Sequence, residues 1–171
     1  MTGENQEAGD QTREGGCACG HLRYRLSGEP VFAGNCHCRL CQQQTGSTSV
    51  VNAFYESERI ELLEGTLSEH RVATGSGGEQ VICRCAQCGT AVWSHYPRLG
   101  RLGAGVRVGT LDDAAGITLD AVIYIESKLP WVALPQGIPA FQQGYDFREV
   151  LPPERFARLM ALAERRKAGE G

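Results

Sequence analysis

The stretch Asn35-Cys36-His37-Cys38-Arg39-Leu40-Cys41-Gln42 places three thiols within six residues. The C-x-C and C-x-x-C spacings allow neighbouring thiolates to converge on one tetrahedral ion, whereas a disulfide across so short a loop is usually strained. We therefore interpret the stretch as a zinc site. A structural zinc normally has four protein ligands, while a catalytic zinc keeps its fourth position open for water or substrate. Three thiols favour the catalytic kind.

Five more cysteines lie on either side of this stretch. Cys17 and Cys19 form a C-x-C pair with glycines on both sides, and Cys83 begins a second C-x-C-x-x-C pattern that continues through Cys85 and Cys88. A glycine follows Cys88, where it relieves the backbone as the sulfur approaches a metal, and an apolar strand is expected at 91–93. The late C-x-x-C-G knuckle is therefore a second zinc signal.

Charge and composition limit the classes of partner and location. The net charge is −3, and the basic residues are spread along the chain, so the sequence predicts no nucleic-acid partner. The first residues lack a basic segment followed by an apolar one, and no apolar run approaches the roughly 20 residues that span a bilayer. We expect a cytoplasmic protein without a membrane span, in which reducing conditions leave thiolates available for metal.

The fold class is predicted to be mainly β. A chain of 171 residues with 42% hydrophobic residues is long enough for one domain with a core, and its 22 glycines favour many tight turns between short strands. Leu22, Tyr24 and Leu26 alternate with polar residues, as in a half-buried strand. The expected strands lie near 22–26, 31–33, 49–55, 59–63, 67–72, 91–93, 106–108 and 121–125, with a hairpin turn at 75–78.

Three parts are expected along the chain. Residues 1–14 are polar and lack aliphatic anchors, which predicts a flexible tail. Residues 15–150 form the zinc-binding domain, whose last part, 129–150, is rich in proline and is expected to be an ordered coil or lid. Residues 151–171 form a C-terminal helix and tail, with Phe156, Leu159 and Ala163 on one helical face that packs.

Five motifs, taken together, resemble one family. They are G-G-C-x-C-G-x-x-R-Y at 15–24, C-H-C-x-x-C-Q at 36–42, T-G-S at 45–47, C-x-x-C-G-T at 85–90 and G-T-L-D-D at 109–113. In this order and spacing they resemble the glutathione-dependent formaldehyde-activating enzyme family, over roughly residues 15–146. The two ends of the chain lie outside the resemblance.

The resemblance implies a fold, two zinc ions and a reaction. The fold is an Mss4-like β-tent of small antiparallel sheets. Cys17, Cys19, Cys85 and Cys88 would hold a structural zinc, which agrees with a physical argument: the early pair needs partners, and the late knuckle supplies two. Cys36, Cys38 and Cys41 would hold a catalytic zinc. The archetypal reaction joins glutathione to formaldehyde to form S-(hydroxymethyl)glutathione, which makes the expected enzyme a carbon–sulfur lyase.

Alternatives remain for the second site and for the whole protein. Cys83 is an extra thiol: as a fourth ligand it would close the site of Cys36, but its place two residues before Cys85 favours a bystander, and the latter is our prediction. His37 is expected to point away from the metal. A noncatalytic zinc module, such as Mss4 or centromere protein V, and a thiol redox or metal sensor are the competing functions.

Some aromatic and basic residues have two interpretations each. Trp93, Trp131, Phe141 and Tyr145 could line a pocket, although aromatic residues more often fill a core. Lys128 and Arg39 could bind the carboxylates of glutathione, although solvated surface charges are the commoner case. The oligomeric state does not follow from the sequence.

Overall fold

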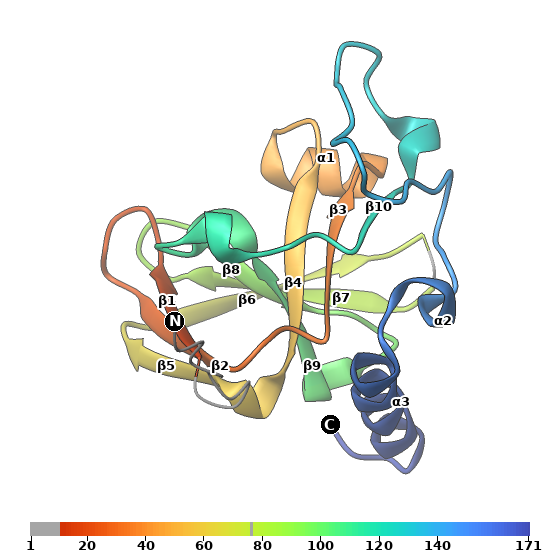
Figure 1. The fold of residues 1–171 in the computed structure, drawn as a ribbon. Helices are drawn as coiled ribbons and strands as arrows, with labels where there is room; N and C mark the ends of the chain where they lie inside the picture. The colour runs from red at the N-terminus through yellow and green to blue at the C-terminus, as the bar shows by residue number, and fades with distance from the viewer. Residues whose placement is uncertain (1–10, 76) are drawn as a thin grey trace, which may run out of the picture.

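Two β-sheets make up most of the structure, a computed structural model that describes residues 11–75 and 77–171 (Figure 1). The mainly β prediction, with a helix near the C-terminus, is confirmed. The strands are β1 (Thr12–Gly16), β2 (Arg23–Ser27), β3 (Phe32–Cys36), β4 (Val50–Glu56), β5 (Ile60–Glu64), β6 (Leu67–Ala73), β7 (Glu79–Cys85), β8 (Ala91–His95), β9 (Gly103–Arg107) and β10 (Ala121–Ile123).

Helices occupy little of the described chain. The α-helices are α1 (Arg39–Thr45), α2 (Phe147–Val150) and α3 (Pro153–Lys167). The 3-10 turns are η1 (Ser57–Arg59), η2 (Gly100–Leu102), η3 (Val108–Thr110), η4 (Ala114–Gly116) and η5 (Ile125–Ser127). Among the helices that the structure describes, none has the length and apolar character that crossing a bilayer requires.

The sheets differ in size. The smaller has the order β1-β2-β5 and is antiparallel, and the larger has the order β10-β3-β4-β9-β8-β7-β6. All pairs in the larger sheet are antiparallel except β10 and β3, which run parallel. Because β3 lies next to β4 and β4 next to β9, residues far apart in the sequence lie in one row across the larger sheet.

The two faces of the larger sheet carry different residues, because side chains alternate along each strand. On one face, Ala53 pairs with Val106, Val106 with Trp93, and Trp93 with Cys83, and all four belong to the main hydrophobic core. The Tyr24 ring of the smaller sheet packs edge-on against Trp93, with ring centroids 5.6 Å apart. Trp93 is therefore a core residue. The opposite face carries the polar residues Asn52, Ser94 and Arg107 beside apolar ones such as Phe54, and Gln44 of α1 bonds to it.

The C-terminal helix packs as the sequence predicts. Leu159, Leu162 and Ala163 of α3 are buried in a second core cluster, and Phe156 packs against that cluster. Arg158 of this helix makes a two-point contact with Glu56 of β4, at 2.8 and 2.7 Å. The apolar face and the ion pair together hold α3 against the end of the larger sheet (Figure 1).

Two boundaries differ from the sequence prediction. The predicted tail, 1–14, ends too late, because β1 already begins at Thr12 and pairs with β2; residues 1–10 lie outside the described part of the chain. The Arg13 side chain is buried, with bonds to Glu29 and to the Gly116 carbonyl, which gives this polar segment its anchor. The predicted coil, 129–150, ends in α2 rather than continuing as coil.

Candidate metal centres

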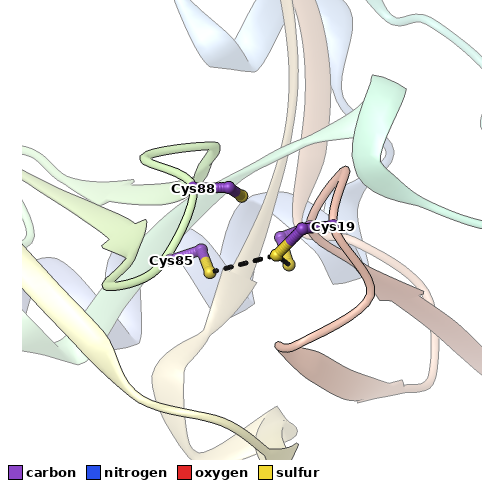
Figure 2. Close-up of side chains that lie close together, drawn as sticks. Cys19, Cys85 and Cys88 are labelled. Atoms are coloured by element: carbon purple, nitrogen blue, oxygen red, sulfur yellow. Dashed lines mark hydrogen bonds between the residues drawn. The ribbon is translucent and has the colours of Figure 1, made fainter.

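Two turns that are far apart in the sequence form the first candidate centre. Cys17 and Cys19 lie on the turn between β1 and β2, and Cys85 and Cys88 lie where β7 ends and turns into β8. The four sulfur atoms lie within 4.8 Å of one another, and we call these residues the four-cysteine group. Figure 2 shows Cys85 and Cys88 on one turn facing Cys19 on the other, with the Cys19 and Cys85 sulfurs 4.0 Å apart.

Glycines make both turns tight enough for this convergence. Gly20 and Gly89 adopt positive φ angles of 76° and 75°, which cost other residues strain. The Gly20 N–H donates to the Cys17 carbonyl at 3.1 Å, and the Gly89 N–H donates to the Cys85 carbonyl at 2.9 Å. These two hydrogen bonds close the turns, so that the sulfur atoms of each pair point toward the other pair.

Hydrogen bonds favour the thiolate form of Cys88 in this group. The side chain and backbone of Thr90 hold the pKa of Cys88 at about 5, and the Cys88 sulfur lies 3.1 Å from the Thr90 hydroxyl. Cys19 and Cys88 are exposed, whereas Cys85 is buried. The group is therefore accessible from one side and tied to the core on the other.

The second candidate centre consists of the three thiols at the start of α1, and we call it the three-cysteine group. Cys36 is the last residue of β3, Cys38 caps the N-terminus of α1, and Cys41 lies in its first turn. Their sulfur atoms lie within 4.8 Å of one another. Neighbouring thiols, first Cys36 and then Cys41, hold the pKa of Cys38 far below its usual range. Cys38 is half-buried and its two partners are buried, so the group reaches solvent at Cys38.

The segment after β10 covers this group. Ile123 and Tyr124 pack against the three-cysteine group, and Tyr124 has a left-handed backbone, with φ of 56°. Gln42 of α1 donates both to the His37 carbonyl, at 2.7 Å, and to the Ser127 carbonyl, at 2.9 Å. Gln42 therefore fixes α1 to the loop that rises above it in Figure 1.

His37 is more deeply buried than the sequence suggests. Its side chain is 1% exposed, and neither ring nitrogen has a hydrogen-bond partner in the structure. Burial lowers the pKa of His37, so the ring is neutral at physiological pH. A surface position for His37 is therefore wrong, while a role in which it points away from the metal and supports the ligands beside it stays a prediction. Its nitrogens are not among the atoms that converge with the three sulfurs.

Cys83 belongs to neither group. Its thiol is buried in the main core opposite Trp93, and burial raises its pKa to about 11. A buried thiol of high pKa behaves as a small apolar side chain. That Cys83 binds no metal stays a prediction.

The cations that the sequence offered for glutathione bond to neighbouring groups of their own segments. The Lys128 ammonium group donates to the carbonyls of Leu129 and Val132, at 3.1 and 2.7 Å, and so braces its own loop. Arg39 donates to Gln42 at 2.8 Å. Trp131 is 74% exposed, and neither it nor these cations lies in a described pocket.

A polar network that the sequence analysis missed lies on the same face of the larger sheet as the three-cysteine group. Arg107 of β9 is buried, and its guanidinium donates to Asn52 at 2.6 Å, to Ser94 at 3.1 Å and to Gln44 of α1 at 3.1 Å. Gln44 also donates to the buried side chain of Gln80 at 2.9 Å. The available signal was an arginine inside the apolar run 104–108.

The chain is similar to known proteins in two of three comparisons. A sequence model described as "Glutathione-dependent formaldehyde-activating enzyme" matches residues 12–127. A search of curated proteins found no match. Among solved structures, a crystal structure of a Rhodobacter sphaeroides protein is similar, with 18% sequence identity and a TM-score of 0.46; the match covers 75% of this chain and 98% of that one.

Proposed function

This chain belongs to the glutathione-dependent formaldehyde-activating enzyme family, and on that premise we propose that it is a zinc-dependent enzyme of carbon–sulfur lyase type. The proposed reaction joins glutathione, or a related small thiol, to formaldehyde and forms the S-hydroxymethyl adduct. The observation that carries the proposal is the convergence of three sulfur atoms, and not four, at a position that solvent reaches.

The sulfur positions fit zinc. In a tetrahedral site with zinc–sulfur bonds of about 2.3 Å, the sulfur atoms lie about 3.8 Å apart. Cys17 and Cys19 have their sulfurs 3.4 Å apart, and Cys19 and Cys85 have theirs 4.0 Å apart, so the four-cysteine group needs little movement to accept the ion. Thiolate donors without oxygen ligands select zinc over magnesium or calcium.

The two groups would have different tasks. The four-cysteine group, Cys17, Cys19, Cys85 and Cys88, supplies a complete ligand set and connects two distant turns, as a structural zinc does. The three-cysteine group, Cys36, Cys38 and Cys41, supplies one ligand fewer and fits a catalytic zinc. Two zinc ions per chain are therefore proposed. The proposed location is the cytoplasm, where reducing conditions keep such thiols free to bind metal.

The chemistry requires a thiolate held next to a carbonyl carbon. When bound, zinc would lower the pKa of a substrate thiol and hold it in place, in the manner of metal-bound water. Cys36 and Cys41 anchor the site in the core, while Cys38 marks its open side. In the overall reaction the thiol sulfur bonds to the carbonyl carbon, and the thiol proton passes to the carbonyl oxygen. Holding the two reactants together supplies much of the rate.

The test is a measurement of exchange between glutathione, formaldehyde and their adduct. Exchange NMR with zinc-loaded protein is expected to show faster adduct formation and breakdown than buffer alone. Cys38→Ser should abolish the acceleration, whereas Cys83→Ser, which removes a thiol outside both groups, should keep it. A rate equal to the uncatalysed exchange in the unmodified protein would reject glutathione as the substrate thiol.

A further inference from the structure

Arg107 is a buried positive charge without a negative partner. The residue is 5% exposed. All three of its hydrogen-bond acceptors, Asn52, Ser94 and Gln44, are neutral. Within residues 11–75 and 77–171, no carboxylate lies within ion-pair distance of this guanidinium. Its Nε atom is buried and has no hydrogen-bond partner. Burying a charge in this way is costly unless an opposite charge lies nearby.

Other shielded arginines of this protein do have carboxylate partners. Arg155 makes a two-point contact with Asp120, and Arg158 does the same with Glu56. Arg13, which is as deeply buried as Arg107, pairs with Glu29 at 3.0 Å. Arg107 is therefore an exception within this fold, and the counter-charge has to come from a group other than a carboxylate.

The three-cysteine group is a source of negative charge to which two neighbours of Arg107 lead. Asn52, which binds Arg107, lies two residues from Val50 on β4, a separation of about 7 Å along a strand. Val50 pairs directly with Cys36 and packs against Cys36 and Cys41. The other neighbour, Gln44, lies one turn beyond Cys41 on α1 and on the same side of the helix. Two hydrogen-bond partners of Arg107 thus connect it to the elements that carry this group.

We propose that Arg107 is the counter-charge of the three-cysteine group, and that it makes this group prefer an anionic sulfur as its exchangeable ligand. The proposal rests on the proposed function, in which zinc binds there. Three thiolates and one zinc ion carry one net negative charge, which a fourth thiolate doubles and a neutral thioether leaves unchanged. A fixed positive charge therefore strengthens the binding of a fourth thiolate. It does not strengthen thioether binding.

The size of the effect can be worked out from Coulomb's law. At an effective dielectric constant of about 20, a unit charge at about 8 Å would change the binding constant of a thiolate by about 30-fold, and a more distant charge would change it less. Arg107 would thus be a specificity-determining residue that touches no substrate atom of its own. Its effect is a difference between two ligands, whereas a purely structural role would alter both equally.

The decisive variant is Asn52→Asp, which neutralises Arg107 without removing it. The substitution preserves shape and places a carboxylate where the Asn52 oxygen now lies, 2.6 Å from Arg107. It gives the guanidinium the ion pair that it lacks, so the fold should be kept. Arg107→Lys is the complementary variant, because it keeps the charge and loses the forked geometry. Arg101→Met changes the net charge as Asn52→Asp does, but at an exposed arginine paired with Glu69, and serves as the control.

Two readouts separate this proposal from the proposed function. The first is zinc content: Asn52→Asp, Arg107→Lys and Arg101→Met should each hold as much zinc as the unmodified protein, because zinc displaces thiol protons and changes the net charge of the group little. The second is calorimetric titration of zinc-loaded protein with glutathione and with S-methylglutathione. Asn52→Asp should weaken binding of glutathione by about 30-fold and leave binding of S-methylglutathione unchanged.

Each outcome decides the matter. Unchanged binding of glutathione in Asn52→Asp, or equal weakening in Arg107→Lys and Asn52→Asp, overturns the counter-charge role. Equal weakening of glutathione and S-methylglutathione overturns the selectivity. If the unmodified protein binds no glutathione, the proposed function fails, and the same titrations with the simple thiol 2-mercaptoethanol still decide the role of Arg107.

Discussion

Replacing one solvent-accessible cysteine in each group should reveal unequal contributions to stability. Cys88→Ser removes a ligand from the four-cysteine group, which joins Cys19 to Cys85 across 66 residues. Cys38→Ser removes a ligand from the three-cysteine group, whose members lie within six consecutive residues. Neither side chain is fully buried, so the substitutions should cost little in packing.

The difference can be estimated from loop closure. A cross-link that closes a loop of about 66 residues stabilises a fold by about 4 kcal/mol, and one that closes about five residues by about 2 kcal/mol. Cys88→Ser should therefore be less stable than Cys38→Ser by about 2 kcal/mol, which corresponds to a melting temperature lower by about 6 °C in a chain of this size.

The assay is thermal unfolding monitored by circular dichroism in reducing buffer, with zinc content measured on the same samples. Each variant should hold one zinc ion, so that the comparison concerns the same change in metal content. Cys19→Ser should reproduce Cys88→Ser, because both residues are exposed ligands of one group. A Cys38→Ser variant that melts as low as Cys88→Ser, or lower, would refute the assignment of the structural role to the four-cysteine group.

Three other predictions concern the core, the backbone and acid stability. Cys83→Ala should keep the zinc content of the unmodified protein and cost about 1 kcal/mol on denaturant unfolding, since this buried thiol packs opposite Trp93; loss of one zinc ion would make Cys83 a ligand. Gly15→Ala should cost about 2 kcal/mol in the same assay, because a Cβ atom would come within 2.5 Å of the Thr110 carbonyl and 2.6 Å of the Tyr24 hydroxyl; unchanged stability would show that β1 can shift. Glu56→Gln should cost about 2 kcal/mol at pH 7, and much less near pH 3. Although burial opposes it, the Arg158 guanidinium holds the pKa of Glu56 below its usual value, so the stabilisation is present above the ordinary carboxyl pKa and disappears as pH falls through the folded one. Equal losses at both pH values in unfolding titrations would contradict this assignment.

The sequence could predict which cysteines lie together, because their spacing is a local property. Cys36, Cys38 and Cys41 meet through the end of a strand and the first turn of a helix, and both are short-range structures. The partners of Cys17 and Cys19 could be inferred from the family resemblance and from the lack of any nearby thiol. The metal in either group stays a prediction that the zinc measurements test.

The sequence could not predict the network of Arg107, because its members come from four separated segments. Asn52, Ser94 and Arg107 meet only when β4, β8 and β9 lie in one sheet with the observed register. A shift of one residue in any of these strands would turn that side chain to the opposite face. Similarly, the burial of Arg13 depends on Glu29 and Gly116, so composition alone assigned it to a tail.

The repeated C-x-C-x-x-C pattern shows why spacing alone does not define a ligand set. At Cys36 the strand ends, and the next cysteine already caps α1, so the chain bends and the three sulfurs meet. At Cys83 the strand continues to Cys85, and two residues of extended chain separate the sulfurs along β7 by about 7 Å. Cys83 therefore stays in the core beside Trp93, while Cys85 reaches the turn. The same spacing therefore gives three converging thiols at Cys36 and only two ligands at Cys83. The difference is that the strand ends at the first cysteine of the pattern in one case and continues past it in the other.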